Sequence, residues 1–174
     1  MSKPDISEYA PFYKRYIDIL TDDRSLVGHL EASLQAFTDL LYKLESEKWN
    51  YRYAEDKWTV KEVVQHMIDT ERVFAYRALR FARNDHTPLA GFDENRFAEE
   101  SEAGERDHEA LVKEFILLRN STILMFSGFE ERILLRRGWI GDKPMSVRAA
   151  GYICSGHVRH HLQVISERYL SGLL

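Results

Sequence analysis

The fold is decided by a stretch close to the C-terminus, SGHVRHHLQVISERYL (residues 155–170), which contains three of the seven histidines in the chain. Its apolar residues recur at helical spacing, which predicts a helix over about 146–171 with Ser146 as its N-cap. At 100° per residue, His157 and His161 lie inside the apolar sector of this helix and His160 lies on its edge. The sector is formed by Ala150, Ile153, Cys154, Val158, Val164 and Ile165.

The pair His157 and His161 can be read in two ways. Side chains four residues apart on one helix have Cβ atoms about 5–6 Å apart, so both rings can converge on one metal ion. Alternatively, each is a core histidine that is hydrogen-bonded to a neighbour. Two polar rings in one small apolar volume cost about 1–3 kcal/mol each when left unpaired, which weakens the second interpretation.

A catalytic metal site needs a third protein ligand and a position open to water. His66 is the candidate, because it lies about two turns into another predicted helix, at the margin of its apolar stripe. A half-buried histidine at a helix rim is the alternative, since histidine is commonly intermediate in burial. The sequence HVRHH has no glutamate after its first histidine, which disfavours a zincin metallopeptidase.

The other long apolar periods also predict helices, so the expected fold class is all-α. Thr59 and Glu62 form a capping-box pattern at the start of the helix that carries His66. In a helix near 107–127, the residues in phase are expected to face the core, and these are Leu111, Phe115, Leu118 and Leu124. A four-helix bundle with a short extra N-terminal helix is the simplest architecture, with helices near 6–20, 23–46, 59–84, 107–127 and 146–171.

Two segments between the helices lack a long apolar period. Residues 85–106 contain Pro88, Gly91 and Gly104, and predict a long connection with one helical turn near Asn95–Glu99. About 22 extended residues reach about 70 Å, enough to return along a whole bundle. The stretch SGFEERILLRRGWIGDKP (residues 127–144) is interpreted as turn-rich.

Composition narrows the classes of protein. The 174 residues suit one domain (1–174), with the bundle core at about 23–171, and no apolar run approaches a membrane span. A net charge of −4 without a basic block disfavours nucleic acid as a partner. The polar start predicts no signal peptide and Cys154 is the only cysteine, so a cytoplasmic location is expected.

Three motifs, taken in order, resemble the DinB/YfiT-like metalloenzymes: KWTVKEVVQHMIDTERVFAYRALRFARND (57–85), FDENRFA (92–98) and GHVRHHLQVI (156–165). The resemblance covers about residues 23–171. It implies an up-down-down-up bundle, a homodimer, and a divalent metal held by His66, His157 and His161. Nitrogen ligands suit zinc, with nickel as the second choice.

The resemblance implies an enzyme with a small-molecule substrate. The first hypothesis is a thiol S-transferase, in which the metal activates a low-molecular-weight thiol such as bacillithiol or mycothiol. The second is a hydrolase that uses metal-bound hydroxide. The third is a non-catalytic metal-binding or stress-response scaffold. A structural zinc site normally has four protein ligands and only three are apparent, which favours catalysis.

Four further residues are considered for the site. Asp69 could orient a ligand ring, and Arg77 could bind the carboxylate of a substrate or thiol. The alternative for Arg77 is a solvent-facing arginine, and for Glu71 a surface salt bridge is expected. Cys154 is expected to pack in the core as a small apolar residue.

Overall fold

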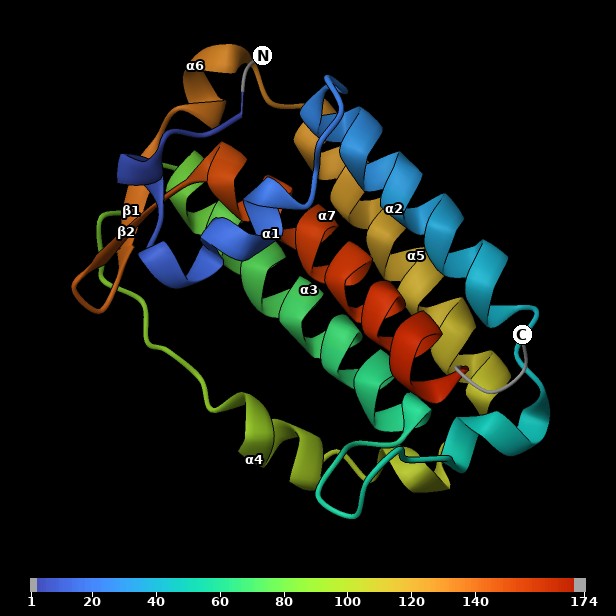
Figure 1. The fold of residues 1–174 in the computed structure, drawn as a ribbon. Helices are drawn as coiled ribbons and strands as arrows, with labels where there is room; N and C mark the ends of the chain where they lie inside the picture. The colour runs from blue at the N-terminus through green and yellow to red at the C-terminus, as the bar shows by residue number, and fades with distance from the viewer. Residues whose placement is uncertain (1–2, 171–174) are drawn as a thin grey trace.

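The computed structural model describes residues 3–170 and contains four long helices that form a bundle (Figure 1). The bundle helices are α2 (Leu26–Leu41), α3 (Val60–Ala82), α5 (His108–Ser127) and α7 (Val147–Val164). The predicted all-α four-helix bundle is therefore confirmed. α2 starts three residues later and ends five residues earlier than predicted, and residues 46–50 form a separate 3₁₀ turn after it. α3 and α5 lie within two residues of their predicted bounds. α7 continues as a π-helical turn at Ile165–Tyr169, and the predicted end at residue 171 lies outside the described residues.

The four bundle helices run in the predicted up-down-down-up order of directions. α7 packs against α2 and α3, and α5 packs against the same two helices. The colour ramp in Figure 1 shows that α3 and α5 run parallel to each other, and that α2 and α7 run in the opposite direction. This is an up-down-down-up bundle, in which α3 and α7 are antiparallel neighbours.

Two of the bundle helices begin at the N-cap residues that the sequence predicted. The Thr59 hydroxyl accepts a hydrogen bond from the Glu62 amide, and the Glu62 carboxylate accepts one from the Thr59 amide at 2.6 Å. This capping box fixes the first turn of α3. Ser146 caps α7 by accepting from the Ala149 amide, as predicted.

The predicted N-terminal helix over 6–20 is wrong in extent. The segment consists of 3₁₀ turns at Ile6–Glu8 and Pro11–Tyr13, followed by the short helix α1 (Lys14–Asp18). Pro11 explains the interruption, because proline lacks an N–H and clashes with the preceding turn inside a helix. The glutamate Glu8 is buried in an ion pair with Arg148 of α7, which ties the segment to the bundle.

The long connection from α3 to α5 runs back along the bundle, as the parallel direction of these helices requires (Figure 1). It contains the helix α4 (Glu94–Glu99) at the predicted position, followed by a 3₁₀ turn at Ala103–Glu105. α4 packs against α3.

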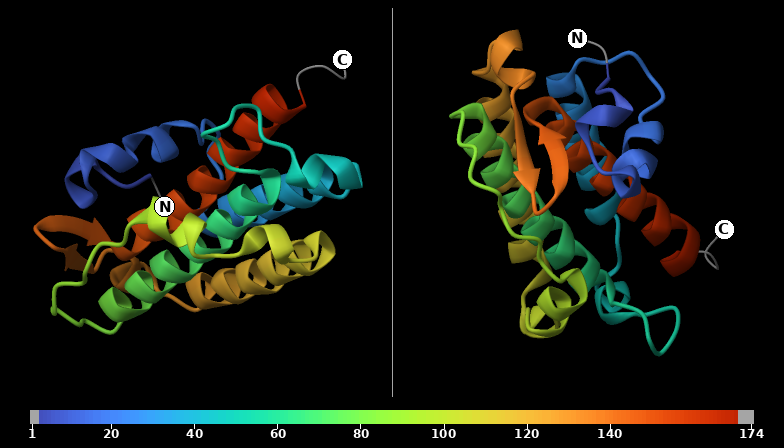
Figure 2. Two further views of the ribbon diagram at one scale, coloured as in Figure 1. Left: turned by 90° about the horizontal axis from the view of Figure 1, so that it is seen from below. Right: turned by 90° about the vertical axis from the view of Figure 1, so that its left-hand side faces the viewer.

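The stretch after α5 is more ordered than predicted. It contains the four-residue helix α6 (Glu131–Leu134) and an antiparallel hairpin of β1 (Arg137–Ile140) and β2 (Lys143–Ser146). The two-residue loop places Gly141 at φ +57°, a conformation that glycine adopts without strain. The Leu89 amide donates to the Trp139 carbonyl at 2.8 Å, so the hairpin also anchors the long connection. Figure 2 shows the hairpin at one end of the bundle.

The core consists of two apolar clusters along the bundle, one beneath α1 and the hairpin and one around Trp49 and Phe115. α5 faces this core with Leu111, Phe115 and Phe126, whereas Leu124 is 75% exposed. The expectation that Leu124 faces the core is therefore wrong. Among residues 3–170, no helix is long and apolar enough to cross a membrane.

α1 packs closely against α7 at Gly156. A Cβ atom at Gly156 would lie 1.8 Å from the backbone oxygen of Tyr16, so only glycine allows this approach. The Tyr16 ring then contacts the His157 ring edge-on, with centroids 5.3 Å apart. Gly156 thus allows an N-terminal aromatic side chain to cover His157.

Replacing Gly156 with alanine should force α1 away from α7. We expect the free energy of unfolding to fall by about 1–3 kcal/mol, as in other overpacked cores, although alanine favours helix. Gly28→Ala is the matched control, because that helical glycine has only side-chain atoms nearby, none closer than 3.3 Å. Urea denaturation of the wild type and both variants checks this, and equal stability of Gly156→Ala and Gly28→Ala would contradict the close contact.

Candidate metal centre

The histidines of α3 and α7 meet inside the bundle. The Nε2 atom of His157 lies 2.9 Å from Nε2 of His66 and 3.0 Å from Nε2 of His161. The potential ligand atoms of the three rings all lie within 4.8 Å of one another. Residues 91 positions apart in the chain are therefore neighbours, because α3 and α7 are antiparallel and place them at the same level.

The spacing of these nitrogens suits a metal ion after a small adjustment. Zn–N bonds of about 2.0–2.1 Å at tetrahedral angles separate the nitrogens by about 3.3 Å. The two shorter separations are a few tenths of an ångström less, which small rotations of the rings would correct. The group contains only three ligand residues, so a tetrahedral ion here would keep one position open.

Burial keeps these rings neutral, which is the form that coordinates metal. Burial lowers the pKa of His66 to about 4. Burial, together with the charges of the neighbouring histidines, holds the pKa values of His157 and His161 well below the usual range. The three nitrogens are therefore available as donors at neutral pH without losing a proton.

Aromatic side chains enclose the histidine cluster. The Trp58 ring lies 4.8 Å from the His66 ring, and Tyr16 covers His157. A cavity of about 110 Å³ opens beside His157, between α3, α7 and the N-terminal segment. A small ligand in this cavity would lie beside His157, against a mainly apolar and aromatic wall.

Asp69 makes no contact with the rings. Its carboxylate accepts a hydrogen bond from Gln65 at 2.9 Å and lies 3.9 Å from Arg72. Among residues 3–170, no carboxylate is hydrogen-bonded to the ring of His66, His157 or His161. The structure therefore gives no support for Asp69 as the residue that orients a ligand ring.

Arg77 is only 2% exposed, so the solvent-facing alternative is wrong. Its Nη2 atom donates to the Ala90 carbonyl at 3.1 Å, and its guanidinium lies over the rings of Phe74 and Phe92. The side chain lines the same cavity as His157. The role of Arg77 in binding a carboxylate stays a prediction, and the cavity beside His157 is where such a group would bind.

Glu71 does not form the expected surface salt bridge. Its carboxylate is 2% exposed and forms a bidentate pair with Arg119 of α5, with both N–O distances at 2.7 Å. Arg119 also donates to Ser33 and Leu30 of α2, and to the Cys154 carbonyl of α7 at 3.2 Å. One guanidinium therefore links all four bundle helices, one turn from His157.

Sequence reasoning missed Arg119 for a definable reason. It follows Leu111 and Phe115 at intervals of four residues, so it lies in the apolar stripe of α5, where a charged residue looked like an interruption. A charged residue at a position of the apolar stripe is the pattern that would have predicted the burial of Arg119. Cys154 is buried as expected, and burial raises the pKa of its thiol well above the usual value.

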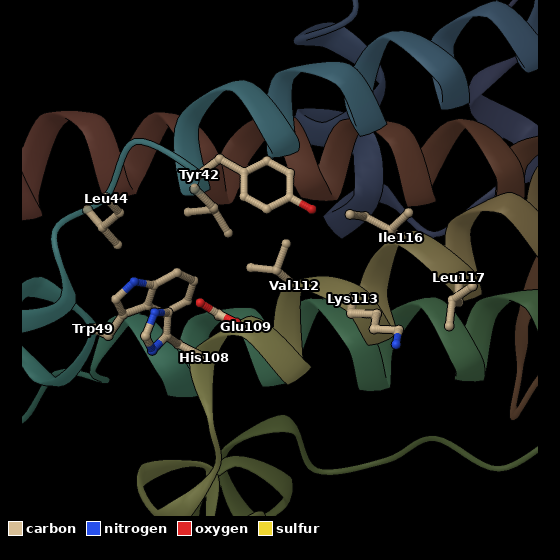
Figure 3. A pocket seen from close by; sticks show the side chains of 10 residues that line it. Tyr42, Leu44, Trp49, His108, Glu109, Val112, Lys113, Ile116 and Leu117 are labelled. Carbon is tan, nitrogen blue, oxygen red and sulfur yellow. The ribbon is translucent and has the colours of Figure 1, made fainter.

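The remaining histidines lie outside the cluster. His29 is buried against Tyr152, and His86 is exposed. His108 is half-buried, and its ring lies 4.9 Å from the Trp49 ring. Trp49 and His108 line a hollow of about 570 Å³ between α2 and α5, whose exposed side chains include Tyr42 and Leu117 (Figure 3).

The fold and the cluster define a class: an all-α up-down-down-up bundle with three histidines, from two antiparallel helices, that could hold a metal ion. The sequence model of the DinB superfamily matches residues 29–165. The chain belongs to the DinB superfamily.

A solved structure supports the fold. YfiT from Bacillus subtilis, described as "a probable metal-dependent hydrolase with an unusual four-helix bundle topology", superposes with a TM-score of 0.75 at 17% sequence identity. The similarity covers 98% of this chain and 93% of YfiT. No curated protein matches the chain. At this identity the likeness establishes the shared bundle, including its order of helices.

Proposed function

We propose that this protein is a divalent-metal-dependent enzyme with a metal held by His66, His157 and His161, and that it transfers a low-molecular-weight thiol to a small electrophile. The observation that carries the proposal is the meeting of the three Nε2 atoms in a buried, aromatic enclosure. Zinc is the preferred ion and nickel the second, because both accept nitrogen ligands.

A bound divalent ion would supply Lewis acidity, which lowers the pKa of a thiol or a water molecule at neutral pH. The chain contributes three uncharged ligands, so the positive charge of the ion stays uncompensated by protein carboxylates. Trp58 and Tyr16 cover the rings and limit the access of water. The cavity beside His157 offers space for the end of a substrate or a thiol.

Thiol transfer ranks above hydrolysis because the surroundings offer little for activating water. The cavity beside His157 is lined mainly by aromatic and apolar side chains, and its one carboxylate is the exposed Glu94. A general base must lie within hydrogen-bond reach of the proton that it accepts. The description of YfiT as a metal-dependent hydrolase favours the second candidate, in which water replaces the thiol.

The test compares the two nucleophiles on zinc-loaded protein. With bacillithiol and monochlorobimane, the thiol sulfur forms a bond to carbon, chloride leaves, and the thiol proton passes to solvent. We expect a fluorescent adduct to form at least about 100-fold faster than without enzyme, a conservative figure against usual enzymatic accelerations. Metal-stripped protein is the control and should lose this acceleration.

The same preparation is assayed for hydrolysis of 4-nitrophenyl acetate without thiol. Metal-dependent ester cleavage together with no thiol transfer would reverse the ranking of the two candidates. Metal binding without either reaction would favour the scaffold hypothesis. The homodimer and the cytoplasmic location also remain predictions, and neither is needed for the assays.

A further inference from the structure

The cavity beside His157 contains two buried polar groups that lack partners. The Nη1 atom of Arg77 and the Oγ1 atom of Thr70 are both inaccessible and have no hydrogen-bond partner. Arg77 is 2% exposed and Thr70 is 4% exposed. Such groups cost about 1–3 kcal/mol each when unsatisfied, and more when the group is charged, so their presence in one cavity calls for an explanation.

Arg77 also lacks a counter-ion. Among residues 3–170, no Asp or Glu oxygen lies within 4.0 Å of its guanidinium, whereas the other fully buried arginine, Arg119, is paired with Glu71. A buried charge normally has a partner, since the desolvation of an isolated ion is expensive. The Arg77 guanidinium therefore has an unused N–H donor at Nη1, and the Arg77 side chain lines a cavity that reaches His157.

We infer that Arg77 and Thr70 form a subsite that binds the carboxylate of a substrate or thiol co-substrate, next to the histidine cluster. A guanidinium matches a carboxylate in shape, and Thr70 adds a hydroxyl donor one helical turn after His66. The inference rests on the proposed function only in taking the occupant to be a reactant. Its chemical basis is the pair of unpartnered groups.

The size and charge of the cavity select a carboxylate. The cavity is small, with a volume of about 110 Å³, so it admits a group of a few non-hydrogen atoms. Sites for whole drug-sized ligands measure about 300–1,000 Å³. Glu94 also lines the cavity, and its negative charge makes a doubly charged phosphate a poorer occupant than a singly charged carboxylate.

The test uses acetate as the probe on metal-free protein, followed by NMR chemical shifts at constant ionic strength. We expect saturable shifts around Thr70 and Arg77 in the wild type. In Arg77→Gln, affinity for acetate should fall about 10- to 100-fold, the range for a charge-assisted hydrogen bond. Arg83→Gln, an exposed arginine at the end of α3, removes the same charge and should leave acetate binding unchanged.

Two further variants keep the test decisive if Arg77→Gln does not fold. Arg77→Lys retains the positive charge but loses the planar fork, and Thr70→Val retains the shape but loses the hydroxyl. Both should bind acetate more weakly than the wild type. Equal affinity in the wild type and all Arg77 variants would overturn the subsite. Tighter binding of inorganic phosphate than of acetate would overturn the choice of carboxylate.

A separate zinc titration distinguishes this inference from the proposed function. Arg77→Gln should bind zinc as the wild type does, because Arg77 is not a ligand. If the wild type binds acetate through Arg77 but takes up no zinc, the metal proposal fails and the carboxylate subsite stands. If zinc binds and acetate does not, the subsite fails and the metal proposal stands.

Discussion

His157→Ala should lose tight zinc binding while keeping the bundle fold. His157 is the central residue of the cluster, because its Nε2 atom lies about equally close to those of His66 and His161. Zinc sites with four protein ligands bind with about 10–16 kcal/mol, or about 3 kcal/mol per ligand. The loss of one ligand should therefore weaken the affinity by about 100-fold or more.

The measurement is a zinc titration against a chromophoric chelator, on protein purified without a nickel column. His160→Ala is the matched control, because His160 lies on the same helix, its ring contacts the His161 ring, and it is not part of the metal-binding group. It should keep zinc affinity within a few-fold of the wild type. Circular dichroism verifies that His157→Ala is helical. Equal zinc affinity of His157→Ala and the wild type would contradict the site.

The fold was largely predictable because its helices carry local signals. Thr59 and Glu62 mark the start of α3 by a capping box that depends only on residues three positions apart. The spacing of His157 and His161 also predicts a shared face, since both lie on one helix. The pairing with His66 could not follow from periodicity, which says nothing about how helices are arranged. The place of His66 at the margin of an apolar stripe made it a candidate, and the resemblance to a family put it in one site with the other two histidines.

What the sequence did not reveal depends on contacts between distant segments. A surface position was expected for Glu71 and was the alternative for Arg77, because charged residues usually lie there. Both are buried, and the environment of each is created by other segments of the chain. The hairpin is different, because its signal was local. Gly141 and Asp142 form a two-residue loop of a type that favours hairpins, and the stretch was interpreted only as turn-rich.

The burial of Arg119 predicts a large loss of stability when its side chain is removed. In Arg119→Ala the carboxylate of Glu71 would be left buried without its partner. Removing one member of a buried pair typically costs about 3–5 kcal/mol. For a domain of this size that corresponds to a fall in Tm of about 6–20 °C. Arg132→Ala is the control, since its ion pair with Glu130 is exposed and worth less than about 1 kcal/mol.

A double variant separates the lost ion pair from a simple loss of packing. In Glu71→Leu with Arg119→Met, no charge is left unpaired, and apolar replacements of buried pairs are often neutral or stabilising. The double variant should therefore be more stable than Arg119→Ala, as measured by calorimetry and urea denaturation. If both are equally destabilised, packing rather than charge dominates at this position. Arg119 also donates to the Cys154 carbonyl, one turn before His157. A double variant that is as stable as the wild type and still binds zinc more weakly would show that the Arg119 guanidinium also positions His157.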